Sequence, residues 1–200
     1  MGPDIISKFA RLYGLGAATQ IDLPFEEKGF VPSRVDRRMK GNQGWYRGDT
    51  LNFSIGQGDT LVTPMQLVRM MGTVARNGRE IQPHLLKTIG GQEIVKFSTV
   101  RSVPIPQKVF DLLKDGLRQV VTAEGGTAQI LNMDGFQVSG KTGTAQSTAG
   151  KDAHAWFVGY DTSGKTKILF CVFLEYGGSS YNAVVVMRDL LLGMRRDGII

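Results

Sequence analysis

The chain is poor in the residues that bind metals or form cross-links: it has one cysteine, Cys171, and two histidines, His84 and His154, among 200 residues. A single cysteine excludes an internal disulfide and a cysteine-based zinc site, and neither histidine has a second ligand at metal-binding spacing. No apolar run approaches the roughly 18 residues that span a membrane, and the N-terminus lacks the features of a signal peptide. We therefore expect no metal and no cofactor, and any targeting segment would lie outside this sequence.

The composition is that of a folded domain. Charged residues make up 21% and apolar residues 42% of the chain, which excludes disordered, collagen-like and coiled-coil proteins. The 26 glycines are about twice the usual share, which indicates many tight turns rather than a helical bundle. We expect an α/β (α+β) fold with an antiparallel sheet flanked by helices, in one compact unit.

The net charge of +6 is mild, and the longest basic cluster, residues 34–40, contains Asp36 and no interleaved aromatic residue. A nucleic-acid partner is therefore not expected.

Hydrophobic periodicity predicts where the helices lie. Thr63-Pro64-Met65-Gln66 supplies an N-cap, a first-turn proline and a capping box, and Asn77-Gly78 ends the helix that follows. Apolar residues at helical spacing from Val109 to Val121 predict a second amphipathic helix, which ends before Gly125-Gly126. Further helices are expected over 5–13 and 181–196, with a short helical stretch through 131. The prolines and glycines of 17–45 indicate a loop.

Strands are expected in two places. Residues 85–89 and 93–97 flank Gly90-Gly91 and predict a hairpin. Three β-like runs, 136–146, 155–160 and 166–176, predict an antiparallel meander covered by the last helix.

Gly135 to Thr142 matches the phosphate-loop pattern G-x-x-x-x-G-K-[ST]. Phosphate binding by this pattern requires a glycine-rich loop between a strand and a helix, with the helix N-terminus facing the phosphates. Here Phe136 and Val138 favour a strand, and Gly143 and the residues after it are poor helix formers. A nucleotide hydrolase is therefore a remote alternative.

The same residues contain Lys141-Thr142-Gly143, a K-T-G element placed on a strand. The stretch SGKTGTAQ at 139–146 and the following HAWFVGY at 154–160 resemble the K-T-G strand and next strand of class B penicillin-binding proteins. Upstream, SIGQG at 54–58 and TPMQL at 63–67 occur in the order of that family, and the stretch around Ser54 is most similar to its elongation-type branch. The resemblance runs from about Gly2 to Arg195.

The resemblance implies a peptidoglycan D,D-transpeptidase, which acylates a serine with a D-alanyl-D-alanine stem peptide and also binds β-lactams. Lys141 and Thr144 would be catalytic, with the Thr144 N–H as one oxyanion-hole donor. Thr142, Gly143 and Thr144 would bind substrate: the two threonines share one strand face, and Gly143 lets the substrate approach the backbone. Solvated strand residues with no such role are the alternative.

Two family motifs are missing before K-T-G. No lysine has a serine three residues before it, so the Ser-x-x-Lys nucleophile is absent, and the single Ser-x-Asn, at 180–182, follows K-T-G and is taken as coincidence. Residues 1–200 are therefore interpreted as the C-terminal part of a transpeptidase domain, with its K-T-G strand at 136–146.

Expected partners are peptidoglycan stem peptides, β-lactams, the upstream part of the same domain and the cell-elongation machinery. The expected location is the cell envelope, at the extracytoplasmic face of the bacterial inner membrane. A non-catalytic module of the same fold, which binds peptidoglycan or a protein partner, is the alternative from another functional class. Cys171 is expected to be inert packing in an apolar strand, and His154 to be structural or to line the mouth of the site.

Overall fold

The computed structural model describes residues 2–39, 44–93 and 99–200. These residues form two compact units, one of residues up to 73 with 79–103 and the other of 74–78 with 104–200. The expectation of one compact unit was wrong. The chain leaves the first unit after Thr73 and rejoins it at Arg79. Within the first unit, Arg101 of the later segment donates from Nη2 to the Leu12 carbonyl of the earlier segment at 2.8 Å.

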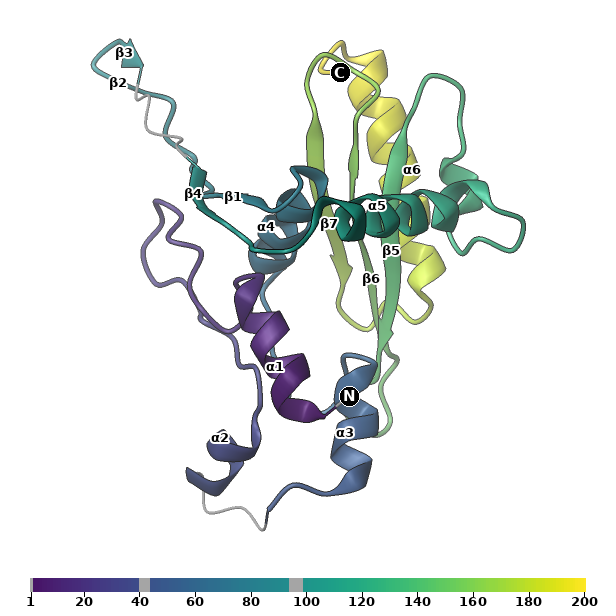
Figure 1. Ribbon diagram of the computed structural model, residues 1–200. Coiled ribbons are helices and arrows are strands. Elements are labelled where there is room, and N and C mark those ends of the chain that lie inside the picture. Colours follow the sequence, from purple (N-terminus) through teal and green to yellow (C-terminus); the bar gives the residue numbers. More distant parts are fainter. Residues whose placement is uncertain (1, 40–43, 94–98) are drawn as a thin grey trace. The chain divides into compact units, whose positions relative to one another are not determined.

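The first unit is mainly helical, with short strands (Figure 1). Its helices α1 and α4 and the β2–β3 hairpin confirm three of the predicted elements. The elements are α1 Pro3–Leu12, α2 Arg34–Met39, α3 Arg47–Ser54, α4 Pro64–Ala75, β1 Arg79–Ile81, β2 Thr88–Ile89, β3 Gln92–Glu93 and β4 Thr99–Ser102.

Two short helices, α2 and α3, were not predicted, and α2 lies in the stretch expected to be a loop. Both are held by local polar groups rather than by an apolar stripe. The Asp36 carboxylate accepts a hydrogen bond from Ser33 Oγ at the start of α2, 2.6 Å, and the Asp49 carboxylate accepts one from the Tyr46 N–H at the start of α3, 2.8 Å. Helices of six and eight residues are too short to show periodicity.

Helix α4 begins with the predicted capping box. Thr63 Oγ1 accepts from the Gln66 N–H at 3.2 Å, and Gln66 Oε1 accepts from the Thr63 N–H at 3.1 Å. Its apolar residues Met71 and Val74 are buried. Its polar residues Gln66, Arg69 and Thr73 are buried as well, at the i, i+3, i+7 spacing of one helix face.

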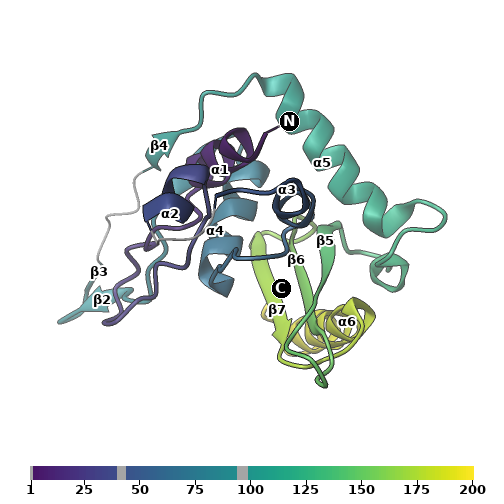
Figure 2. The same ribbon diagram turned by 90° about the horizontal axis from the view of Figure 1, so that it is seen from below.

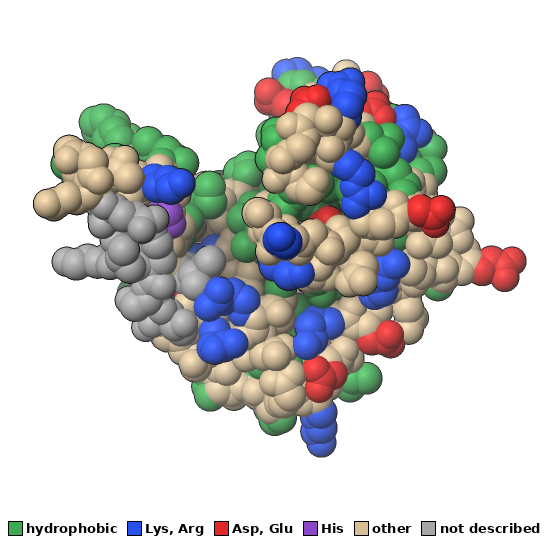
Figure 3. Space-filling view, turned by 90° about the horizontal axis from the view of Figure 1, so that it is seen from above, with side chains coloured by type: hydrophobic (Ala, Val, Ile, Leu, Met, Phe, Trp, Pro, Cys, Tyr) green, Lys and Arg blue, Asp and Glu red, His purple; other side chains and the backbone are tan. Residues whose placement is uncertain are grey.

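The predicted hairpin turns at Gly90 and Gly91, both with positive φ. Each of its two strands is only two residues long. Thr88 pairs with Glu93, and Ile89 pairs with Gln92. The rest of the expected second strand, 94–97, lies outside the described residues. Hydrophobic side chains are exposed on the hairpin and on the residues just before it (Figure 3), among them Leu85, Leu86 and Ile89.

The second unit holds the predicted meander, a sheet in the antiparallel order β5-β6-β7. Helix α6 covers one face of the sheet, and α5 packs against β5 (Figures 1 and 2). The elements are α5 Gln107–Thr122, the short 3-10 helix η1 Gln129–Leu131, β5 Val138–Ala145, β6 His154–Asp161, β7 Ile168–Leu174 and α6 Ser180–Arg196.

The core of this unit lies between the sheet and α6. Side chains alternate along each strand, so one set of strand residues packs against the helix. Gly140 and Gly159 face each other there, and a Cβ at Gly140 would lie 2.7 Å from the Val158 carbonyl oxygen. The core residues are Val121, Ala128, Leu131, Phe136, Val138, Ala155, Phe157, Phe170, Val172, Ala183, Val184, Met187 and Leu191.

Leu131→Ala is expected to lower the free energy of unfolding by about 2–5 kcal/mol, because Leu131 is fully buried and its removal leaves a cavity. Leu112→Ala is the matched control, since Leu112 is 71% exposed and its loss should cost less than about 0.5 kcal/mol. Urea unfolding followed by circular dichroism measures both. Equal effects would show that η1 does not belong to the core.

Candidate functional site

The K-T-G residues lie inside a strand. Gly140, Lys141 and Thr142 belong to β5 and pair with Gly159, Val158 and Phe157 of β6. A phosphate loop needs its backbone N–H groups free to surround an anion at the start of a helix. Here the backbone forms a sheet ladder, and residues 146–153 contain turns and no helix. The nucleotide-hydrolase alternative was therefore wrong.

The register divides the K-T-G side chains between the two faces of the sheet. Thr142 and Thr144 share one face, as their alternation predicts, and their pairing with Phe157 and Ala155 places that face toward α6. Lys141 and Gly143 lie on the opposite face. In the described part of the chain, β5 has a strand partner on one side only, which leaves an open edge where both faces meet.

Lys141 reaches from its own face toward that edge. Its side chain is exposed, its Nζ donates to the Thr142 carbonyl oxygen at 3.0 Å, and it lies 3.5 Å from Thr142 Oγ1. An ammonium has three donors and no acceptor. The edge therefore combines a positive charge with a hydroxyl, which suits the binding of a carboxylate.

Both threonine hydroxyls contact groups outside the strand. Thr142 Oγ1 lies 2.8 Å from Thr127 Oγ1, and Thr144 Oγ1 accepts from the N–H of Ser180, the first residue of α6, at 3.2 Å. Thr127 was not among the predicted site residues. The signal that precedes it is Gly125-Gly126, which was interpreted only as the end of a helix.

Aromatic side chains lie on the Lys141 face of the sheet. Trp156, which pairs with Gly143, packs against Phe173 with ring centroids 4.1 Å apart. His154 packs against Phe173 and Tyr176 at 5.5 and 5.0 Å, and its Nδ1 accepts from the Tyr176 N–H at 3.1 Å. That bond leaves the proton of the neutral ring on Nε2. These contacts favour the structural interpretation of His154.

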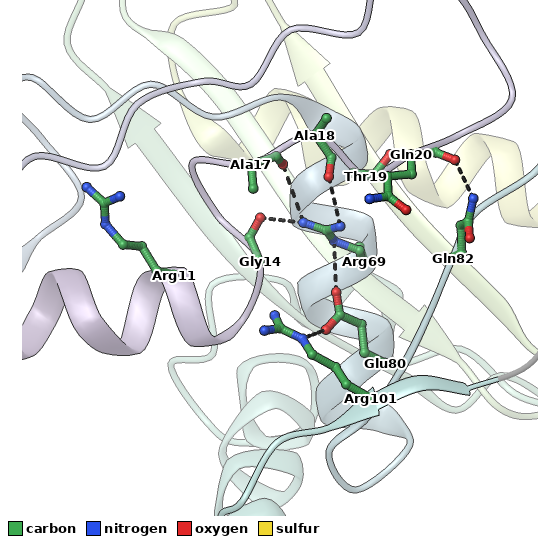
Figure 4. Close-up of a pocket in the computed structure, with 10 residues that line it drawn as sticks. All are labelled: Arg11, Gly14, Ala17, Ala18, Thr19, Gln20, Arg69, Glu80, Gln82 and Arg101. Atoms are coloured by element: carbon green, nitrogen blue, oxygen red, sulfur yellow. Dashed lines mark hydrogen bonds and ion pairs between the residues drawn. The ribbon is translucent and has the colours of Figure 1, made fainter.

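A separate polar cavity of about 240 Å³ lies in the first unit (Figure 4). The buried Arg69 guanidinium donates to the Gly14 and Ala18 carbonyls and lies 3.4 Å from Glu80, and Arg101 also pairs with Glu80. Burial lowers the pKa of Arg69, but the paired carboxylate keeps the charge compensated. These interactions join α4 to β1, β4 and the loop after α1, and indicate a structural role.

The sequence matches a family model over most of its length. The model is that of the penicillin-binding protein transpeptidase domain, and it covers residues 1–191. The chain belongs to this family. The resemblance carried by the K-T-G and upstream motifs is thereby confirmed.

Penicillin-binding transpeptidases with curated names are similar over most of the chain. This chain is 31% identical to the peptidoglycan D,D-transpeptidase MrdA of Haemophilus influenzae. The match covers 96% of this chain but only 32% of the MrdA protein. Thus the chain covers about a third of the relatives that it matches.

Solved structures of penicillin-binding protein 2 confirm the predicted fold. The match to the Pseudomonas aeruginosa protein in complex with WCK 5153 has a TM-score of 0.82 at 34% identity, and covers 94% of this chain and 43% of that one. The match to the Helicobacter pylori protein in complex with MreC also has a TM-score of 0.82, at 28% identity, and covers 100% and 37%.

Two other kinds of feature are absent from the described residues. None of the helices there is both long and apolar enough to cross a membrane. No group of three His, Cys, Asp or Glu side chains in that part of the chain is placed to hold a metal ion.

Cys171 lies in β7 and pairs with Val158, on the same sheet face as Trp156 and Phe173. It is half-buried, and desolvation raises the pKa of its thiol from 9.0 to about 11. Because the thiolate is the reactive form, this environment supports the interpretation of Cys171 as a packing residue.

Iodoacetamide should therefore modify Cys171 about 100-fold more slowly at pH 8 than a thiol with the ordinary pKa, since its thiolate fraction is lower by that factor. The rate should keep rising until the pH reaches about 11. Mass spectrometry of timed samples measures it, with the urea-unfolded chain as control. Equal rates for the folded and unfolded chains would contradict the assigned environment.

Proposed function

We propose that this chain supplies the donor-carboxylate site of a peptidoglycan D,D-transpeptidase, at the open edge of β5. The observation that carries the proposal is the convergence of the Lys141 ammonium and the Thr142 hydroxyl at that edge. The D-alanyl-D-alanine end of a stem peptide is a carboxylate, and a carboxylate accepts charge-assisted hydrogen bonds from such groups. The names of the relatives support the same activity.

Gly143 gives independent support. Its φ is not in the left-handed region, and a Cβ placed there would come no closer to a neighbour than 3.4 Å, from Trp156 Cβ. Neither the backbone conformation nor packing in the described structure strongly requires a glycine. We infer that the bare backbone at Gly143 serves a substrate that lies against the strand.

The edge also offers backbone groups. An extended donor peptide can pair with a strand edge through main-chain hydrogen bonds. In this proposal the N–H of Thr144 is one of the two oxyanion donors, and it stabilises the negative charge that develops on the scissile carbonyl oxygen. The Thr144 hydroxyl, on the same strand face as Thr142, is a second contact for the donor.

The nucleophile comes from elsewhere in this proposal. In acylation a serine oxygen attacks the carbonyl of the penultimate D-alanine, the peptide bond breaks, and the terminal D-alanine leaves with the serine proton on its amine. An acceptor amine then takes the acyl group and releases the serine. No Ser-x-x-Lys occurs among the 200 residues, so this chain would act together with the part of the domain that carries that motif.

Location and partners follow from the same function. The Helicobacter pylori relative forms a complex with MreC, and another similar structure is that of a peptidoglycan synthase complex. We propose that the protein works at the extracytoplasmic face of the bacterial inner membrane, as part of the cell-elongation machinery, on peptidoglycan stem peptides.

The isolated chain should form no covalent adduct with a labelled penicillin, because no serine in it has the lysine base of Ser-x-x-Lys. Intact-mass analysis after incubation tests this, with a complete transpeptidase as positive control. A stable adduct mapped to any serine of this chain, Ser180 included, would contradict the assignment of the nucleophile to another segment.

Restoring the missing motifs tests the proposed function itself. In a domain completed with the upstream part, Lys141→Ala should lower the acylation rate by about two orders of magnitude or more, because it removes the charge from the site. Lys141→Arg should retain part of the rate, since it keeps the charge but changes the donor geometry. Thr144→Ala should be milder, because the backbone N–H remains.

Stopped-flow acylation by a chromogenic β-lactam measures these rates. Lys165→Ala is the matched control, because Lys165 is exposed in the turn between β6 and β7. Rates close to wild type for Lys141→Ala would show that Lys141 is a solvated strand residue and that the proposed site is wrong. Equal losses for Lys141→Ala and Lys165→Ala would indicate only a general effect of charge.

A further inference from the structure

The turn after α5 approaches the helix unusually closely. Helix α5 ends at Thr122, Gly125 has a φ of +78°, and a Cβ added to Gly126 would lie 2.5 Å from the Val120 carbonyl oxygen and 3.0 Å from that of Ala123. A side chain at Gly126 would collide with the end of the helix. The two glycines therefore allow the chain to fold back against α5.

This turn places Thr127 beside the K-T-G strand. The next residue, Ala128, is fully buried and its N–H donates to the Val120 carbonyl at 3.0 Å, which fixes the backbone. The exposed Thr127 hydroxyl then lies 2.8 Å from Thr142 Oγ1, the usual distance for a hydrogen bond between hydroxyls. The first residue of β5 is also tied to α5, because Arg118 Nη1 donates to the Val138 carbonyl at 2.6 Å.

The direction of the Thr127–Thr142 hydrogen bond depends on what Thr142 binds. A hydroxyl has one proton to donate and two lone pairs to accept with, whereas a carboxylate only accepts and an ammonium only donates. When Thr142 donates its proton to a bound carboxylate, its oxygen is left to accept from its neighbours. Those neighbours are Thr127 Oγ1 and Lys141 Nζ, which lies 3.5 Å away.

We propose that Thr127 is a positioning residue for the donor carboxylate, an inference that rests on the proposed function. It donates to Thr142 Oγ1, holds the threonine rotamer, and turns the Thr142 proton toward the open edge of β5. A chain of hydrogen bonds polarises its members, so the Thr142 donor is also strengthened. Thr127 itself does not touch the substrate.

The test uses the isotope-labelled 200-residue chain and two ligands, N-acetyl-D-alanyl-D-alanine and its C-terminal methylamide, which has no carboxylate. Amide shifts of Gly143 and Thr144 give a Kd for each ligand, and their ratio measures the preference for a carboxylate. Thr127→Val and Thr127→Ala should reduce this preference about 3- to 10-fold, the effect of one lost hydrogen bond. Thr127→Ser, which keeps the hydroxyl, should stay within about 2-fold of the unaltered chain.

Thr122→Val is the matched control, because the Thr122 hydroxyl is exposed and donates to the Arg118 carbonyl of its own helix, at 3.1 Å. It should leave the preference unchanged. Thermal unfolding of each variant shows whether the fold is retained.

The outcomes separate the two proposals. If the unaltered chain prefers the carboxylate and both Thr127→Val and Thr127→Ala keep that preference, the positioning role is wrong and the proposed function stands. An equal loss of affinity for both ligands would indicate a merely structural role for Thr127 and would also overturn the inference. If the unaltered chain shows no preference for the carboxylate, the proposed donor site is wrong and the role of Thr127 fails with it.

Discussion

In the antiparallel ladder between β5 and β6, each residue of the K-T-G segment faces one residue of β6, and this register sends neighbouring side chains to opposite faces. A shift by one residue would turn Thr142 and Thr144 away from α6 and bring Lys141 against the core. The buried Val138 of β5 opposes such a shift, because it would lose its place between the sheet and α6. The geometry of the candidate site therefore depends on the packing of the core.

The same strand carries both packing and chemistry along its length. Its first residues, Val138 to Gly140, are buried, whereas Lys141 and Thr144 are exposed. Gly140 is required by close packing, since a Cβ there would meet the Val158 backbone, but Gly143 has more room. Gly140 is thus explained by close packing in the core, whereas Gly143 is explained by its place at the open edge.

In the first unit, hydrogen bonds of buried polar side chains hold a loop against a helix. In the second unit, apolar packing holds the sheet against α6. Gln66 Nε2 donates to the Ala17 and Lys28 carbonyls, both at 2.8 Å, and Arg69 binds carbonyls of the same loop. A loop buried against a helix needs partners for its backbone groups, and these side chains provide them. This explains why a polar stripe on α4 is buried beside its apolar face.

The sequence by itself determined the long elements, the meander and the family. The capping box of α4, the periodicity of α5 and the alternation in β5 are local signals, and each was followed by the expected structure. The short helices α2 and α3 have local polar contacts but are too short to show periodicity. The division into two units and the burial of Arg69 and Gln66 were decided by contacts between distant residues. Thr127 belongs with them, because it meets Thr142 across 15 positions, through a close backbone approach at Gly126 that only folding of the chain against α5 creates.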